Sequence, residues 1–303
     1  MWLAAGDDPH PFPMKTSPPI RWRCGDRQVD LSGRALVMGI LNVTPDSFSD
    51  GGRYTGVEAA VEHALQMLQD GADILDIGGE STRPGALPVP VEEELRRVVP
   101  VIEAVRRESD VLISVDTRKA VVAREALRCG ARIINDVTAL TGDSEMAEVA
   151  RRHGAGVVLM HMLGEPQTMQ ASPRYDDVVA EVGAYLGRRI QDLVAAGLDP
   201  ETLAIDPGIG FGKTVEHNVS LLVHLDRLCA LGRPVVVGLS RKSFLGKITG
   251  REMGDRLSAS LGGAAYAILR GAQVIRVHDV KESCDVARLM AIFGAEQAGD
   301  AVS

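Results

Sequence analysis

Short apolar runs alternate with longer segments of helical periodicity from residue 35 onward. Several of the longer segments, such as VEAAVEHALQMLQDG at 57–71, end in glycine, as helices commonly do. Apolar strands that alternate with helices predict a parallel sheet that is covered on both faces. The apolar runs are, in order, ALVMGILNV, DILDIGG, VLISVDT, RIINDV, GVVLMHM, LAIDPG, PVVVGLS and QVIRVHD.

Eight strand–helix units of this length predict a closed (β/α)8 barrel, the TIM barrel. An open doubly wound sheet is the alternative, but it would need a dinucleotide fingerprint after its first strand, and GILNVTPDSF contains none. Ahead of the barrel, RWRCGDRQVD predicts a short hairpin that turns at Gly25 and Asp26. The sequence therefore divides into a flexible, Pro-rich arm at 1–19, one domain at 20–295 and a tail at 296–303.

A side chain that could bind a ligand or take part in a reaction, in most cases a polar one, stands at the carboxyl end of nearly every predicted strand. In a barrel these ends converge on one mouth, where barrel enzymes carry out their chemistry. Capping of the following helix explains any single position, but a full ring of polar groups would be costly to remove from water without a use. The ring comprises Asn42, Asp76, Asp116, Asn135, Met160 with His161, Asp206, Ser240, and Arg276 with His278.

Three cations are predicted to gather beside the last two strands. Lys242 lies at the expected start of a helix, whose free N–H groups favour anions. Arg276 and His278, two residues apart on one strand, face the same way. Barrels often bind phosphate at this corner. The loop DPGIGFGKT is a different case, because Pro207 stands where a phosphate-binding GxxxxGK loop needs glycine.

Composition narrows the class of protein. The chain has 303 residues, 45% hydrophobic and 24% charged, with a formal net charge of −8, as expected of a soluble enzyme and not of a nucleic-acid binder. No apolar stretch reaches membrane-spanning length, and the four cysteines are widely spaced, so we expect a cytoplasmic protein with reduced thiols. There is no metal-binding His/Cys spacing typical of zinc. Asn42 and neighbouring carboxylates would instead suit a weakly held Mg²⁺ that is shared with a phosphate ligand.

Seven motifs then follow one another in a diagnostic order: MGILNVTPDSFSDGG, DIGGESTRPG, VDT, INDV, DPGIGFGK, SRKSF and RVHDV. From about residue 20 to about residue 295 the chain resembles the dihydropteroate synthase family of pterin-binding enzymes. The resemblance implies a (β/α)8 barrel that makes 7,8-dihydropteroate from 6-hydroxymethyl-7,8-dihydropterin diphosphate and 4-aminobenzoate in folate biosynthesis. It also implies a need for Mg²⁺, inhibition by sulfonamides and a homodimer.

The resemblance further implies roles for individual residues, carried over position by position. The implied pterin-binding residues are Asp116, Asn135, Met160, Asp206 and Lys242. The implied diphosphate-binding residues are Asn42, which is also the metal ligand, Thr82, Arg276 and His278. The implied aminobenzoate-binding residues are Phe48, Thr82, Arg83, Pro84, Phe211 and Ser243. Asp46, Lys242, Arg276 and His278 are the implied catalytic residues.

The loop at 44–52 would then close as a lid over diphosphate and Mg²⁺, with Gly51 and Gly52 allowing it to move. Three other functions remain open. A pterin-dependent methyltransferase would need a corrinoid partner and no diphosphate site. An aldolase would form a Schiff base on Lys242 or Lys247. A degenerate barrel would bind without catalysis.

Overall fold

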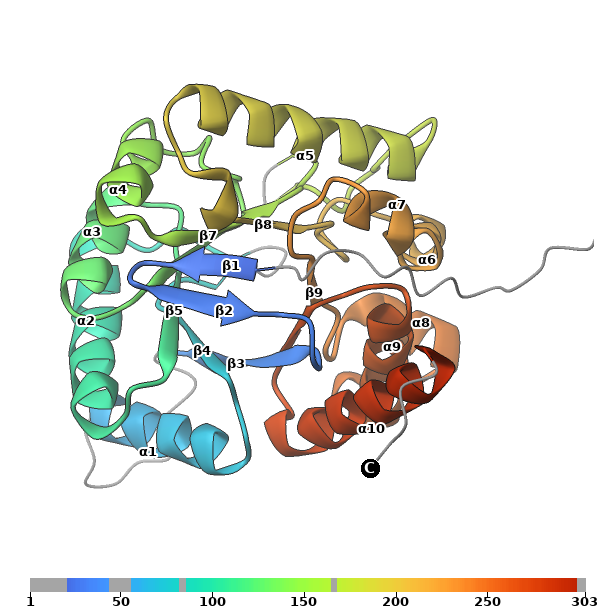
Figure 1. Cartoon of the computed structure of the whole chain (residues 1–303), viewed down its shortest axis with the longest axis horizontal. Coiled ribbons are helices and arrows are strands. Elements are labelled where there is room, and N and C mark those ends of the chain that lie inside the picture. Colours follow the sequence, from blue (N-terminus) through green and yellow to red (C-terminus); the bar gives the residue numbers. More distant parts are fainter. Residues whose placement is uncertain (1–20, 44–55, 82–85, 165–167, 299–303) are drawn as a thin grey trace, which may run out of the picture.

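The computed structural model describes residues 21–43, 56–81, 86–164 and 168–298. Within these ranges, ten α-helices surround eight parallel strands (Figure 1). The strands are β3 (Leu36–Asn42), β4 (Ile74–Gly78), β5 (Leu112–Asp116), β6 (Ile133–Asp136), β7 (Gly156–Met160), β8 (Leu203–Asp206), β9 (Val236–Gly238) and β10 (Val274–Val277). The helices are α1 (Gly56–Gln69), α2 (Val91–Glu108), α3 (Ala120–Arg128), α4 (Met146–His153), α5 (Val178–Ala195), α6 (Val215–Val223), α7 (Leu225–Cys229), α8 (Ser243–Thr249), α9 (Leu257–Leu269) and α10 (Val280–Ala298).

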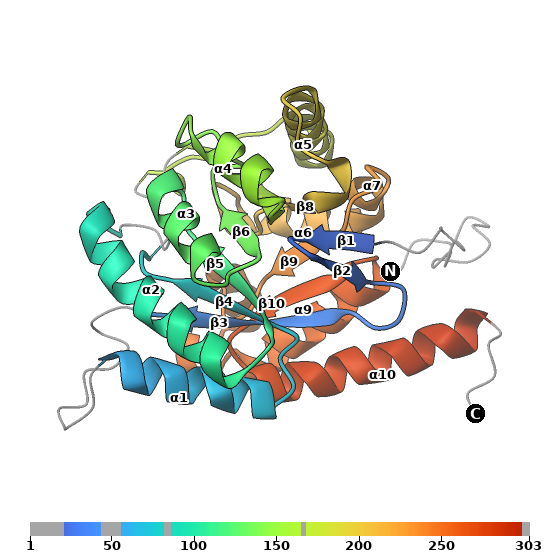
Figure 2. The same ribbon diagram turned by 60° about the vertical axis from the view of Figure 1, so that its left-hand side comes forward.

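The strands close into a barrel. Their order is β8-β7-β6-β5-β4-β3-β10-β9, and each neighbouring pair is parallel. The two ends of this sheet meet through a bridge between Ile205 and Val235, and the N–H of Ile205 donates to the carbonyl of Pro234 at 2.8 Å. The predicted (β/α)8 barrel is therefore confirmed, with the helices forming an outer ring (Figure 2).

The helices are held to the barrel by apolar stripes. In α2 the fully buried residues Val98, Val101, Ile102 and Val105 recur at the three- and four-residue spacing that brings side chains to one face of a helix. These residues join the large core between the strands and the helical ring. The same periodicity that predicted the helices thus also fixes which side of each helix faces the sheet.

The interior of the barrel changes from wholly apolar to largely polar in one step along the strands. A first layer takes one apolar residue from each strand: Met38, Ile74, Leu112, Ile133, Val158, Ala204, Val236 and Val274. Side chains alternate along a strand, so the residue two positions further on faces the same interior. That second layer consists of Ile40, Asp76, Ser114, Asn135, Met160, Asp206, Gly238 and Arg276.

The predicted hairpin is confirmed and closes the amino-terminal end of the barrel. Its strands are β1 (Arg21–Cys24) and β2 (Arg27–Asp30), joined by a turn in which Gly25 has a φ of +65°. Trp22 is fully buried against the first interior layer, and its Nε1 donates to the carbonyl of Thr202 at 2.8 Å. Figure 1 shows the hairpin lying across this end of the barrel. Ligands must therefore enter from the opposite end.

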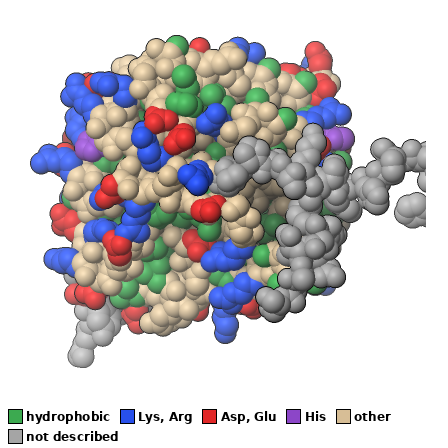
Figure 3. All heavy atoms as spheres, in the orientation of Figure 1, with side chains coloured by type: hydrophobic (Ala, Val, Ile, Leu, Met, Phe, Trp, Pro, Cys, Tyr) green, Lys and Arg blue, Asp and Glu red, His purple; other side chains and the backbone are tan. Residues whose placement is uncertain are grey.

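The surface around the hairpin carries both signs of charge. Figure 3 shows acidic and basic side chains interspersed on this face, without the single basic stripe that a nucleic-acid-binding face would present. In the described ranges, every helix is either too short or too polar to cross a bilayer.

Candidate active site

The polar layer is organised around one guanidinium. Arg276, from β10, donates from Nε to Oδ2 of Asp76 on β4 and from Nη2 to Oδ2 of Asp116 on β5, each at 2.6 Å. Asn135, on β6, donates from Nδ2 to the same Oδ2 of Asp76 at 3.0 Å. Asp76 is completely buried, so it depends on these donors for its stability as a charged group. Four strands are tied together inside the barrel by this network.

The charges in this network alter one another. The pKa of Asp116 is raised to about 7, chiefly by burial; the attraction of Arg276 opposes this shift and the repulsion of the nearby Asp76 adds to it. Burial works against the charge of Arg276, but the attraction of Asp76 and Asp116 prevails and raises the pKa of the guanidinium above its ordinary value. Arg276 therefore stays charged, while Asp116 can be protonated or ionised near neutral pH.

A second charged group faces the same interior from β8 and the start of α8. Burial lowers the pKa of Lys242 to about 8, against the attraction of Asp206. Burial raises the pKa of Asp206, against the attraction of Lys242. The ammonium of Lys242 lies 4.3 Å from the centroid of the Phe211 ring and donates to the carbonyl of Ile209. Asp206 and Lys242 thus form a pair whose charges depend on each other and on what fills the space between them.

The loop after β8 is shaped by a close approach to β7. The N–H of Gly208 donates to Oδ1 of Asp206 at 2.7 Å, which turns the chain directly after the strand. Gly208 has a φ of +65°, and a Cβ at this position would lie 1.9 Å from the carbonyl oxygen of His161. Only glycine fits here. The tight turn at Gly208 therefore lets the loop bring Phe211 to the mouth, where its ring centroid lies 4.3 Å from the ammonium of Lys242.

Lys213 fixes the same loop from beneath, a role that the sequence interpretation missed. Its buried Nζ lies 3.1 Å from Nδ1 of His161 and donates to the carbonyls of His161, at 3.3 Å, and Phe211, at 2.9 Å. Burial lowers the pKa of Lys213 to about 7, opposed by Asp206, and burial lowers the pKa of His161 to about 3. The sequence did carry a signal for this role, because Lys213 stands in an otherwise apolar, glycine-rich loop just after a strand.

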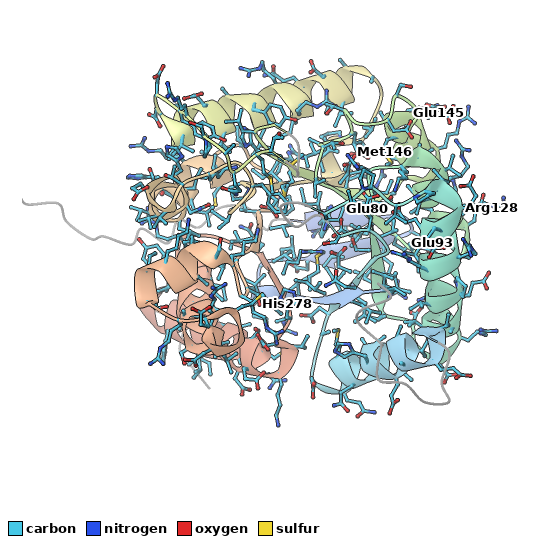
Figure 4. All side chains as sticks on the ribbon, turned by 180° about the vertical axis from the view of Figure 1, so that it is seen from behind. Glu80, Glu93, Arg128, Glu145, Met146 and His278 are labelled. Carbon is cyan, nitrogen blue, oxygen red and sulfur yellow. The ribbon has the colours of Figure 1, made fainter. Side chains whose placement is uncertain are left out.

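The exits of β9 and β10 carry the predicted phosphate-binding corner. Lys242 is the N-cap residue of α8, and Ser243 is the first residue of that helix and is exposed. His278 directly follows β10, and its Nδ1 lies 3.1 Å from Oγ of Ser240. In the view into the mouth, His278 lies on the interior side of the helical ring, as does Glu80 across from it (Figure 4).

Glu80 belongs to a second unpredicted cluster, which anchors the loop after β4. It pairs with Lys119 at 2.6 Å and with Arg118 at 3.1 Å, and its Oε2 accepts the N–H of Val89 at 2.9 Å. Lys119 also donates to the buried Glu94 of α2. The cluster fixes both sides of the loop that carries Thr82, Arg83 and Pro84.

Most predicted site residues meet at one mouth. Asn42 and Met160 end β3 and β7, and Met160 is the register neighbour of Asp206. The predicted residues that the structure places at the carboxyl ends of the strands or in the loops that follow them are Asn42, Asp116, Asn135, Met160, Asp206, Phe211, Lys242, Ser243, Arg276 and His278. Asp46, Phe48, Thr82, Arg83 and Pro84 lie outside the described residues.

Asn42 is the described residue that the sequence predicts as a metal ligand. Within the ranges that the structure describes, no group of three or more His, Cys, Asp or Glu side chains could hold an ion. Asn42, half-buried at the exit of β3, offers an amide oxygen, which is the hard type of ligand that Mg²⁺ prefers. A single amide oxygen fits an ion that takes most of its ligands from a phosphate group and water, and does not fit a closed metal site.

Comparison with known proteins agrees with this site. Residues 38–278 match the family described as pterin binding enzyme. The dihydropteroate synthase of Escherichia coli (strain K12) is 51% identical over 254 residues, covering 84% of this chain and 90% of the relative. The structure of Xanthomonas albilineans dihydropteroate synthase with 4-aminobenzoic acid has a TM-score of 0.85 and 50% identity, over 92% of this chain and 99% of that one. The same Xanthomonas enzyme in complex with 7,8-dihydropteroate has a TM-score of 0.82 and 48% identity, with the same coverage.

The barrel with its polar mouth thus defines a class of enzyme, and the chain belongs to the pterin-binding enzyme family. Within that family its activity is that of a dihydropteroate synthase, a transferase of folate biosynthesis.

Proposed function

We propose that the residues of the described mouth divide the synthase reaction into three tasks: holding the pterin, accepting the diphosphate and placing the arylamine. The observation that carries this proposal is the convergence of Asp116, Asn135, Asp206, Lys242 and Arg276 on one interior. The reaction joins 6-hydroxymethyl-7,8-dihydropterin diphosphate to 4-aminobenzoate and yields 7,8-dihydropteroate and diphosphate.

The deep part of the mouth suits a pterin ring. One edge of a pterin presents ring N–H, exocyclic NH₂ and carbonyl groups in a row, and two carboxylates with an amide can pair with that row. Asp116 and Asp206 supply the acceptors, and Asn135 supplies both an acceptor and a donor. The buried Met160 offers an apolar surface beside them. In return the ligand gives these buried carboxylates the hydrogen-bond donors that they need.

The cations at the exits of β9 and β10 suit the leaving diphosphate. In the reaction, the bond between the pterin methylene and the diphosphate oxygen breaks, and the electron-rich ring stabilises the positive charge that is left. Arg276 and His278 would accept the anion, while Lys242 holds the pterin. A bound Mg²⁺, held by Asn42 and ordered with the help of Asp46, would supply further positive charge to the diphosphate. Stabilising charge that develops during the reaction is a large part of catalysis.

The outer part of the mouth suits the arylamine. Phe211 offers a ring edge, and Ser243 offers a backbone N–H and a hydroxyl at the start of α8, where a carboxylate is favoured. Phe48, Thr82, Arg83 and Pro84 would complete this slot. The arylamine nitrogen is neutral at pH 7 and attacks the methylene directly; the proton that it then loses passes to the diphosphate or to water, so the site needs no strong general base.

One assay tests this function. Purified protein, the pterin diphosphate, 4-aminobenzoate and Mg²⁺ should give dihydropteroate, and a chelator should stop the reaction. Lys242→Ala should lower kcat/KM by about 10²–10³-fold or more, as the loss of one preorganised hydrogen-bond donor does. Its circular dichroism and melting curve should match a folded protein. A Lys242→Ala variant with normal kcat/KM would remove Lys242 from the site.

We also propose that the enzyme is a homodimer. On α10 the side chains of Leu289, Ile292 and Phe293 are 49%, 49% and 51% exposed, and their spacing brings them to one face of the helix. An exposed apolar face of this kind suits a second copy of the chain. Light scattering should give twice the mass of 32.3 kDa for the wild type. Ile292→Glu should give the monomer mass, and a dimer that tolerates this charge would place the interface elsewhere.

The compartment is proposed to be the cytoplasm. All four cysteines, Cys24, Cys129, Cys229 and Cys284, are free thiols in the structure, as is usual in a reducing compartment.

A further inference from the structure

Two neighbouring loops at the mouth are joined by two consecutive contacts. Ser240 and Arg241 follow β9, and His278 and Asp279 follow β10. In the first contact, Oγ of Ser240 accepts the backbone N–H of His278 at 3.2 Å and lies 3.1 Å from Nδ1 of the same residue. In the second contact, the guanidinium of Arg241 donates from Nε to Oδ2 of Asp279 at 3.1 Å and from Nη2 to Oδ1. We call these four residues the β9–β10 clip.

The first contact fixes the position of the imidazole. The Ser240 hydroxyl accepts the backbone N–H of His278 and lies within hydrogen-bond distance of Nδ1, to which it can donate its hydrogen or from which it can accept one. A neutral imidazole that accepts at Nδ1 carries its own proton on Nε2. Nε2 is then the donor nitrogen, which is the form that can donate to a phosphate oxygen.

The second contact is kept at a position where the backbone disfavours an arginine. Arg241 has a φ of 59°, in the left-handed region that favours glycine. Its N–H donates to Oγ of Ser260 at 2.9 Å, and its carbonyl accepts from Nη1 of Arg256 at 3.1 Å. The backbone is therefore held at both ends in this conformation. A side chain persists in such a conformation only where its surroundings stabilise it, and strained residues of this kind gather at functional sites.

The Arg241–Asp279 pair is placed so that it can influence the position of His278. Arg241 directly follows Ser240, which contacts His278, and Asp279 directly follows His278. The ammonium of Lys242 is held independently, by the carbonyl of Ile209 and the ring of Phe211. A change in the Arg241–Asp279 pair should therefore move His278 more than it moves the pterin-binding groups.

We propose that Arg241 and Asp279 are positioning residues that, with Ser240, aim His278 at the departing diphosphate. This inference rests on the proposed function of the mouth. The pair joins a side chain that is 47% exposed to one that is 17% exposed, and pairs of this kind contribute little to stability. Variants that lose the pair should therefore fold, and their defects should be confined to recognition of the diphosphate.

Two variants separate positioning from folding. Arg241→Gly removes the ion pair and at the same time relieves the left-handed backbone, so its melting temperature should equal or exceed that of the wild type. Asp279→Asn removes the charge of the partner with almost no change of shape. The matched control is Asp255→Asn, which breaks the exposed Arg251–Asp255 pair close to the same loops but outside the clip.

Calorimetry should compare binding of pterin diphosphate in the presence of Mg²⁺ with binding of 6-hydroxymethyl-7,8-dihydropterin, which lacks the diphosphate. Arg241→Gly and Asp279→Asn should each weaken the first about 10-fold or more, because small misplacements of a catalytic group have large effects. Binding of the second should be unchanged. The double variant should lose no more than either single variant, because both remove the same interaction. Arg241→Lys, which keeps the charge, should recover part of the loss, and Asp255→Asn should bind both ligands normally.

Two results would overturn the proposed role of the clip. One is unchanged binding of pterin diphosphate by Arg241→Gly. The other is an equal loss of affinity for both ligands, which would indicate general damage to the site. Turnover of the wild-type enzyme tests the proposed function separately. A wild type that binds the pterin compounds but makes no dihydropteroate would reject that function, whereas the ratio of the two affinities would still report on the clip.

Discussion

Arg276 donates through Nη2 to Oδ2 of Asp116 at 2.6 Å, although the two residues are 160 positions apart in the sequence. This contact crosses the inside of the barrel from β10 to β5, and it shares its guanidinium with a second carboxylate, that of Asp76. One cation thus neutralises two buried acids, one of which we assign to pterin binding. The floor of the site is therefore already charged and ordered before any ligand arrives.

Arg276→Met should destabilise the fold as well as the reaction. Removing the guanidinium leaves Asp76 and Asp116 buried without their cation, and breaking a buried ion pair in this way costs about 3–5 kcal/mol. Urea denaturation at pH 7 measures the change in the free energy of unfolding. Adding Asp76→Asn to this variant should restore part of the stability. A loss below about 1 kcal/mol would show that the interior is hydrated and not buried.

The pH dependence of kcat/KM for pterin diphosphate should be bell-shaped. Burial raises the pKa of Asp116 to about 7, so the carboxylate that accepts from the pterin forms only as the pH rises through that value. Burial lowers the pKa of Lys242 to about 8, so its positive charge is lost as the pH rises further. Initial rates should therefore increase through about pH 7 and decline above about pH 8. Asp116→Asn should abolish the increase on the acidic side, and a variant that retains it would assign that limb to another group.

Lys213→Met should impair arylamine binding through the loop after β8. The carbonyls of His161 and Phe211 would lose their buried donor, at a cost of about 1–3 kcal/mol, and Phe211 would lose its fixed position. Steady-state kinetics should show a larger rise in KM for 4-aminobenzoate than for pterin diphosphate. Lys247→Met on α8, where the lysine is exposed, is the matched control and should change neither constant. Equal effects on both substrates would point to a general loss of structure.

Trp22→Ala should weaken the closed end of the barrel without altering the chemistry at the other end. The indole is fully buried against the first interior layer, and truncating a buried aromatic side chain costs about 3–5 kcal/mol. The midpoint of denaturation should fall accordingly, while kcat of the folded variant at low temperature stays near that of the wild type. A large drop in kcat with little change in stability would mean that the hairpin reaches the site.

The barrel and the ring of site residues could be predicted from the sequence because both follow from local patterns. Apolar runs alternating with helical segments give the strands their order, and parallel strands must bring their carboxyl ends to one side. Asn42, Asp116, Asn135 and Asp206 needed no further information to be placed at the mouth. Their roles in binding remain predictions.

The partners of these residues could not be predicted in the same way. Asp76 was recognised as part of the ring, but its contact with Arg276 spans 200 positions and depends on how far the strands are staggered when the barrel closes. Lys213 was passed over because its loop was judged only against nucleotide-binding motifs. Its contacts with His161 arise from the packing of two loops, and single-sequence periodicity carries no record of that packing.

Because the hairpin closes one end of the barrel, ligands can enter and leave only through the other end. This imposes an order on their binding and release. Whatever reaches the floor must enter before anything occupies the rim, and it can depart only after the rim has been vacated. If the arylamine binds at the rim, as we propose, a compound that takes its place there would keep the pterin compound below it from leaving. The apparent affinity of such a compound for the enzyme would rise with the concentration of the pterin substrate.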